Sequence, residues 1–103
     1  MDSNNDREKR LKEQVYVDFL MNLAERALDN GNTKYAETTC EECLKYNISS
    51  YIHLVKLGKL CHRLNDLKNA ISCYEKAAEL NENEEILKLL AIAYEKLYNQ
   101  IQN

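Results

Sequence analysis

The chain has 103 residues, of which 45% are hydrophobic, with no proline and two glycines. This length allows one small domain, and the scarcity of helix breakers favours an all-α fold with short connections. The formal net charge of −3 gives no global attraction to nucleic acid or membrane surfaces, and no apolar run is long enough to span a bilayer.

The N-terminal sequence MDSNNDREKR lacks the apolar core of a signal peptide, so secretion is not expected. Four cysteines in a chain without such a signal predict reduced thiols. We therefore expect a cytoplasmic or nuclear protein.

The first predicted helix runs from about Asp6 to Asn30. Asn5 and Glu8 resemble a capping box at its start, and Gly31 suits its C-terminal cap. Residues 1–16 are mostly charged, so they are either a solvated helical extension or the edge of a contact with something else. The expected apolar face comprises Leu11, Val15, Phe19 or Leu20, Leu23, Ala24, Ala27 and Leu28.

Three further helices follow, from about Thr33 to Tyr46, Tyr51 to Leu64 and Leu67 to Leu80, the last two separated by the polar pair at 65–66. Their expected inward residues are Ala36, Cys40, Cys43 and Leu44, then Leu54, Leu57, Leu60, Cys61 and Leu64, then Ala70, Ile71, Tyr74, Ala77, Ala78 and Leu80. A last helix is expected from Glu84 to about Ile101.

Gly58 lies in the middle of a predicted helix, where glycine costs about 1 kcal/mol relative to alanine. We therefore expect a close helix contact at Gly58 to compensate this cost. Ala70 and Ala77 would let the following helix approach a neighbouring backbone.

The order of large, small and aromatic residues in 51–84 resembles the tetratricopeptide repeat. The resemblance is carried by Leu54, Leu57, Gly58, Cys61, Ala70, Tyr74 and Ala77. It departs at Leu54, where an aromatic is usual, at Cys61, where tyrosine is usual, and at Glu82, where proline is usual. None of these departures breaks the helical pattern.

A second copy lies 34 residues earlier, which is the period of this family. Its pairs are Leu20 with Leu54, Leu23 with Leu57, Ala24 with Gly58, Gly31-Asn32 with Asn65-Asp66, Ala36 with Ala70, Cys40 with Tyr74, and Cys43 with Ala77. A third copy begins near Glu84 after a linker one residue shorter, so that Leu87, Leu90, Ala91 and Tyr94 match Leu54, Leu57, Gly58 and Cys61.

The resemblance implies a short right-handed α-solenoid of about five helices in antiparallel pairs. The expected parts are a charged extension over 1–16, repeats over 17–50 and 51–84, and a capping helix over 85–103 that covers the last apolar face. Gly58 and Ala91 are both expected to face inward.

Cys40-Glu41-Glu42-Cys43 has the spacing of half a zinc site or of a redox dithiol. No second pair follows at ligand spacing, and the repeat register places Cys40 and Cys43 in the core, so no metal or cofactor is expected. Cys73 is expected to be partly exposed and the most reactive thiol. With no phosphate-binding loop and no nucleophile motif, the sequence predicts no catalytic residue and a non-enzymatic protein.

In proteins of this resemblance, the first helices of successive repeats line a concave groove. Lys56, Lys59 and Arg63 lie on one helical face within a stretch, 51–63, that has no acidic residue. This stripe predicts pairing with carboxylates or phosphates of a partner peptide, and the alternative is an ordinary solvated face. The predicted partner-binding residues are Ile52, Val55, Lys56, Lys59, His62, Arg63, Lys88, Leu89 and Ile92.

Co-chaperones of this fold hold the C-terminal carboxylate of a chaperone with basic and amide side chains. The matching positions here are Met21, Glu25, Lys56, Glu85 and Leu89, of which Lys56 alone has a suitable charge. A receptor for chaperone tails is therefore disfavoured.

Two functions remain open. The first is an adaptor or scaffold that binds a protein or peptide, acidic or phosphorylated, in its groove. The second is a structural module that self-associates through its charged extension and its terminal helix. Binding of nucleic acid or of a membrane is not expected.

Overall fold

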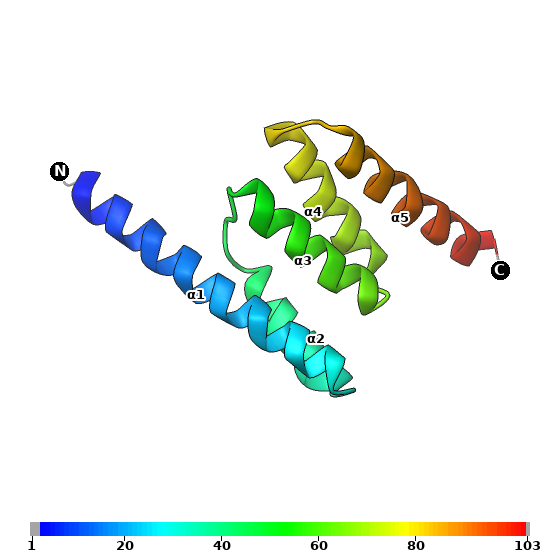
Figure 1. Cartoon of the computed structure of the whole chain (residues 1–103), viewed down its shortest axis with the longest axis horizontal. Coiled ribbons are helices and arrows are strands. Elements are labelled where there is room, and N and C mark those ends of the chain that lie inside the picture. The colour runs from blue at the N-terminus through cyan, green and yellow to red at the C-terminus, as the bar shows by residue number, and fades with distance from the viewer. Residues whose placement is uncertain (1–2, 103) are drawn as a thin grey trace. The chain divides into compact units, whose positions relative to one another are not determined.

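The computed structural model describes residues 3–102, and side chains from residue 5. It contains five helices: α1 (Ser3–Asp29), α2 (Thr33–Cys43), α3 (Tyr51–Arg63), α4 (Leu67–Leu80) and α5 (Glu84–Gln102) (Figure 1). Within that described range there is no strand, so the predicted all-α class is confirmed.

The predicted helix ends need two corrections. Helix α1 begins at Ser3, so Asn5 lies inside the helix and does not cap it. Helix α2 ends at Cys43 rather than at Tyr46, with Leu44 as its C-cap. The polar and aromatic residues after Leu44 form the connection to α3.

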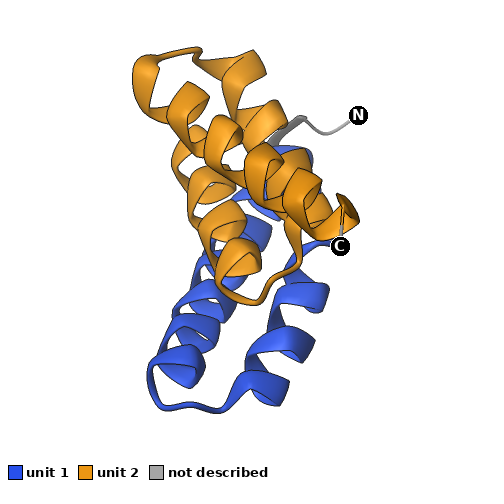
Figure 2. Ribbon diagram, turned by 90° about the vertical axis from the view of Figure 1, so that its right-hand side faces the viewer, with its two compact units in different colours: residues 1–48 blue, residues 49–103 orange. Residues whose placement is uncertain are grey.

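The contacts divide the chain into two compact units, residues 1–48 and residues 49–103 (Figure 2). The length alone predicted one domain. The division has a physical reason: each helix of a repeat array packs mainly on its immediate neighbours, so contacts stay local in the sequence.

The turns after α1 and α3 have the same geometry, as the offset of 34 residues predicts. Gly31 has φ +81° and Asn65 has φ +62°, so both occupy the left-handed region that glycine and asparagine tolerate best. The next residue in each turn donates its backbone N–H to a carbonyl five residues earlier, Asn32 to Ala27 at 2.7 Å and Asp66 to Cys61 at 2.9 Å.

Those next residues also begin the following helices. The Asn32 side chain accepts a hydrogen bond from the backbone N–H of Tyr35, and Asp66 accepts one from Asn69, each at 3.4 Å. Each short polar pair therefore ends one helix and caps the next, which produces an antiparallel helix hairpin.

In the first unit, α1 packs on α2. The core contains Val17, Leu20, Met21, Ala24, Ala27, Ala36, Thr39, Cys40 and Cys43. The predicted inward positions Leu11 and Val15 are wrong, because both are exposed, and of the alternatives Phe19 and Leu20 it is Leu20 that is buried. Residues spaced by four advance about 40° around a helix with each step. The stripe of Leu11, Val15 and Phe19 therefore lies on a different side of α1 from the face that Val17 and Met21 form.

In the second unit, α4 packs on both α3 and α5. Buried residues between α3 and α4 include Leu54, Leu57, Gly58, Leu60, Cys61, Leu67, Ala70, Ile71, Cys73, Tyr74 and Ala77. Leu80, which was expected inward, is exposed at the end of α4.

The close contact predicted at Gly58 is made by Tyr74. A Cβ atom placed on Gly58 would lie 2.5 Å from Cε1 and 2.7 Å from Cδ1 of Tyr74, which are distances that real Cβ atoms do not show. Tyr74 is itself 1% exposed, and this burial raises the pKa of its hydroxyl to about 12. The ring of Tyr74 therefore occupies the space that any other residue at position 58 would need.

Helix α5 packs on α4 through a different face from the one expected. Ile86 and Ala93 are fully buried, whereas Leu87, Ala91 and Tyr94 are exposed. The inward position expected for Ala91 is therefore wrong. Its counterpart Gly58 is covered by the helix that follows α3, and α5 is the last helix that the structure describes.

We predict that Gly58→Ala destabilises the protein, although alanine is the better helix former by about 1 kcal/mol. The added methyl group must displace the buried ring of Tyr74, and overpacking of this kind costs about 1–3 kcal/mol. Urea unfolding followed by circular dichroism measures the difference.

The matched control combines Gly58→Ala with Tyr74→Leu, which removes the clashing ring. Starting from Tyr74→Leu, the added methyl should be neutral or stabilising. Equal effects of Gly58→Ala in the two backgrounds would contradict the assignment of the strain to Tyr74.

Candidate functional site

Helices α3 and α5 run in the same direction along α4, and two side-chain hydrogen bonds tie their ends together. At the N-terminal ends, Asn83 Nδ2 donates to Tyr51 Oη at 2.8 Å. At the C-terminal ends, Gln100 Nε2 donates to Asn65 Oδ1 at 2.7 Å. All nine predicted partner-binding residues lie on these two helices.

Asn83 has a second role at the start of α5. Its Oδ1 accepts a hydrogen bond from the backbone N–H of Ile86 at 3.0 Å, so its side chain caps α5 while its amide nitrogen contacts α3. Asn83 was not among the predicted residues, although an asparagine directly before the first residue of a helix is a recognisable capping signal.

The basic stripe on α3 continues onto α5. Lys59 and Arg63 are exposed and Lys56 is half-buried, at the spacing that places them on one face. His62 lies beside them. Desolvation first, and then the charge of Lys96 on α5, lower the pKa of His62 below its usual 6.5.

Lys96 is a further basic residue, outside the predicted partner-binding set. The signal was available, because Lys96 occupies on α5 the place that Arg63 occupies on α3, given the offset of 33 residues that also matches Leu87 to Leu54. The charge of Lys96 therefore lies close enough to α3 to lower the pKa of His62.

The apolar members of the predicted set differ in how far they reach the solvent. Ile52 is 74% exposed and Ile92 is 58% exposed, so both present large apolar surfaces. Leu89 is half-buried. Val55 is only 8% exposed, and we correct its expected role, because a side chain covered to this extent supports the surface rather than contacting a partner.

An open hollow of about 420 Å³ lies along α5. It is lined by Glu84, Glu85, Lys88, Leu89 and Ile92, so it includes the three predicted residues of this helix. Lys88 Nζ contacts Glu84 Oε1 at 3.1 Å, which neutralises part of its charge. The excess of positive charge therefore comes from α3 and from Lys96. The lining of the neighbouring hollow along α5 combines charged residues of both signs with apolar side chains.

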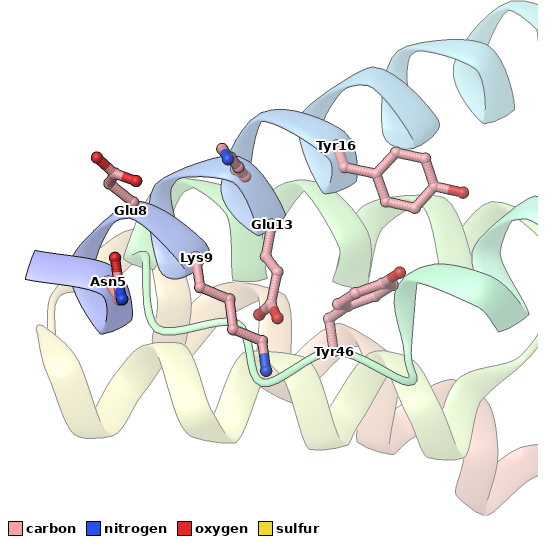
Figure 3. A pocket seen from close by; sticks show the side chains of 7 residues that line it. Asn5, Glu8, Lys9, Glu13, Tyr16 and Tyr46 are labelled. Atoms are coloured by element: carbon pink, nitrogen blue, oxygen red, sulfur yellow. The ribbon is translucent and has the colours of Figure 1, made fainter. Parts of the chain in front are cut away.

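Met21, one of the positions that match the carboxylate-binding residues of co-chaperones, lies in the first unit and is fully buried. It is not available to a ligand. In the same unit, a second hollow of about 390 Å³ lies beside the first turns of α1, where Tyr46 from the connection after α2 faces Tyr16 (Figure 3).

The two tyrosine rings of this hollow meet edge to face, with centroids 5.8 Å apart. Charged side chains of both signs, among them Lys9 and Glu13, form the rest of its lining. Residues 5–15 are otherwise mostly exposed.

All four cysteines are buried thiols. This corrects the expectation for Cys73, which is 4% exposed. A hydrogen bond from Cys61 lowers the pKa of the Cys73 thiol, yet burial keeps reagents in solution away from it. Across residues 3–102, no cluster of three histidine, cysteine or acidic side chains has a geometry that would hold a metal ion.

Comparison with known families supports the resemblance. Residues 54–84 match the family model described as the tetratricopeptide repeat. A comparison with curated proteins found no match. In the part of the chain that the structure describes, no helix has the length and apolarity required to cross a membrane.

We predict that the pKa of His62, measured by NMR titration of its ring protons, lies below 6.5 and rises in Lys96→Gln. That substitution removes one of the two causes that lower the value. Between the lowered pKa and 6.5 the unfolded chain binds more protons than the folded chain, so the free energy of unfolding falls as the pH drops through this window.

Lys76→Gln on α4 is the matched control, since it removes the same charge from an exposed position elsewhere on the unit. In this variant the pKa of His62 should keep its wild-type value. An unchanged pKa in Lys96→Gln would show that Lys96 does not act on this histidine.

Proposed function

We propose that this chain, which carries a tetratricopeptide-type repeat over residues 54–84, is a non-enzymatic module that binds a protein partner on the surface formed by α3 and α5. Repeats of this family are ordinarily interaction modules without catalytic activity. The partner segment is acidic or phosphorylated, and the module serves as an adaptor or scaffold in a larger assembly.

The observation that carries this proposal is the local charge. The chain has a net charge of −3, yet α3 has Lys56, Lys59 and Arg63 and no carboxylate over its whole length. Because Lys96 adds a further cation from α5, an anionic segment lying along these helices would meet positive charge from both.

Apolar contacts supplement the charges. Ile52 and Ile92 expose most of their side chains, and Leu89 and Ile92 line the hollow along α5. A partner with an apolar residue next to its acidic groups would bury these side chains. Such a central apolar contact with a charged rim is the usual composition of a protein interface.

Rigidity favours this surface over the rest of the chain. The hydrogen bonds at Tyr51–Asn83 and Asn65–Gln100 join α3 and α5 at both ends, and both helices pack on α4. The backbone of such a pair of helices is already ordered, so binding does not have to pay for ordering it. The repeat boundaries that accompany this proposal are 17–50 and 51–84, with 85–103 as a terminal half repeat.

We predict that a labelled peptide rich in aspartate and glutamate, or one that carries phosphoserine, binds the chain more tightly than uncharged and lysine-rich peptides of equal length. Fluorescence anisotropy measures the affinities. Lys59→Glu together with Arg63→Glu should weaken binding of the acidic peptides by at least about tenfold, or about 1.4 kcal/mol. Added salt should weaken binding by the wild type.

The matched control is Lys68→Glu with Lys76→Glu on α4, which makes the same change of net charge at two exposed positions. This variant should bind nearly as well as the wild type. Equal losses in the two variants, or full binding by Lys59→Glu with Arg63→Glu, would reject α3 as the binding surface. Affinity capture from a native extract with the same variants then identifies the natural partner.

A further inference from the structure

Helix α5 has a continuous apolar stripe that no described helix covers. Leu87, Tyr94, Tyr98 and Ile101 are between 47% and 71% exposed, and Ala91 between them is exposed as well. The stripe lies about a quarter turn around the helix from Ile86 and Ala93, which pack on α4. It is therefore a second face of α5, separate from its packed face.

The spacing of this stripe is that of a coiled-coil seam. Leu87, Ala91, Tyr94, Tyr98 and Ile101 follow one another at intervals of four, three, four and three residues. This is the alternation of a and d positions in a heptad repeat, with Ala91 and Tyr98 at a and the other three at d. Such a narrow stripe packs against one further helix.

The internal repeat also indicates that this stripe of α5 packs against another helix. Leu87, Ala91 and Tyr94 match Leu54, Gly58 and Cys61, which α4 buries on α3. Tyr94 donates a hydrogen bond to Glu75 on α4, but its ring remains half exposed. The face that requires a neighbouring helix on α3 thus requires one on α5 too.

A second copy of α5, running antiparallel, fits this face. In antiparallel coiled coils each a residue meets a d residue of the other helix. Ala91 then faces Tyr94 of the second copy and Tyr98 faces its Leu87, so both of these pairs join a smaller residue to a larger one, and Ile101 lies opposite Glu84 at each end of the seam. A parallel pair would place Tyr94 on Tyr94 and Ala91 on Ala91, which crowds one layer and leaves a gap in another.

The charges beside the seam also select the antiparallel arrangement. Lys88 and Glu95 occupy the charged e positions along one edge of the stripe, which Gln102 continues, and both are exposed. In an antiparallel pair the e residues of the two helices lie opposite each other, so Lys88 of each copy meets Glu95 of the other. A parallel pair would instead place Glu95 opposite Leu90.

We propose that the chain forms a two-fold symmetric dimer through antiparallel pairing of α5, with Ala91 and Tyr94 at the centre and two Lys88–Glu95 ion pairs at the edge. The interface is isologous, because the same stripe is used by both copies. The seam leaves the basic stripe of α3 uncovered, and Lys88 belongs both to its edge and to the hollow along α5. Ala91→Glu therefore tests the dimer without changing a predicted partner-binding residue.

Sedimentation velocity of the full chain over a range of concentrations tests this dimer. The wild type should sediment as a monomer and dimer in equilibrium. Ala91→Glu, which places a charge at the exposed centre of the seam, should give a monomer with unchanged helicity. Lys88→Glu and Glu95→Lys should each raise the dissociation constant at least about tenfold, because like charges then face each other.

The decisive variant combines Lys88→Glu with Glu95→Lys, which restores opposite charges across an antiparallel pair and should restore the dimer. A mixture of the two single variants should form heterodimers for the same reason. Lys76→Glu on α4 is the control for the change of net charge, and it should leave the dimer intact.

Three results would overturn the proposal. The first is a wild type that stays monomeric at all concentrations, as a chain whose stripe receives a helix of another protein would. The second is a failure of the charge exchange to restore the dimer. The third is a dimer that Val15→Glu dissolves and Ala91→Glu leaves intact, since the contact would then belong to the exposed stripe of α1.

Discussion

The second unit depends on one contact, that of the Tyr74 ring with the backbone of α3 at Gly58. The missing side chain at position 58 lets an aromatic ring lie where a Cβ atom would be, so α3 and α4 approach closely. The helical propensity that glycine loses is offset by burial of the ring. Because α5 packs on the same α4, the placement of α3 relative to α5 follows from this approach.

That placement brings three separate sequence features onto two helices that are joined at their ends. The cations of α3, the cation at Lys96 and the apolar side chains Ile52 and Ile92 lie on helices that run in the same direction and are joined at both ends. An acidic protein can therefore present a locally basic face. The overall charge of the chain gives no information about such a face, because it averages over all sides of the molecule.

The apolar pattern that recurs on α3 and α5 is buried on one helix and exposed on the other. The same apolar face is buried on α3, where α4 follows, and exposed on α5, where the structure describes no following helix. An exposed stripe at heptad spacing is not an ordinary solvated surface, since burial of such side chains contributes about 1.5–3 kcal/mol each. Helix α5 thus covers α4 with one face and exposes an apolar stripe on another.

The sequence by itself determined the existence of the five helices, the two matching turns and most of the core between α3 and α4. These features are local: amphipathic spacing fixes a helix and its face, and a left-handed residue followed by a capping side chain fixes a turn, as Gly31-Asn32 and Asn65-Asp66 do. Glycine at position 58 likewise predicted a close helix contact, because such a contact offsets the free-energy cost of glycine inside a helix.

Only the tertiary structure decided which apolar face of α1 and of α5 is covered. Both helices are apolar on more than one side, and periodicity cannot tell which side meets a neighbour; Leu11, Val15 and Ala91 were therefore placed inward although they are exposed. The burial of Val55 and Cys73 and the approach of Lys96 to His62 also depend on groups far apart in the sequence. Burial and charge proximity are properties of the packed helices together, whereas the pattern along one helix records only its own geometry.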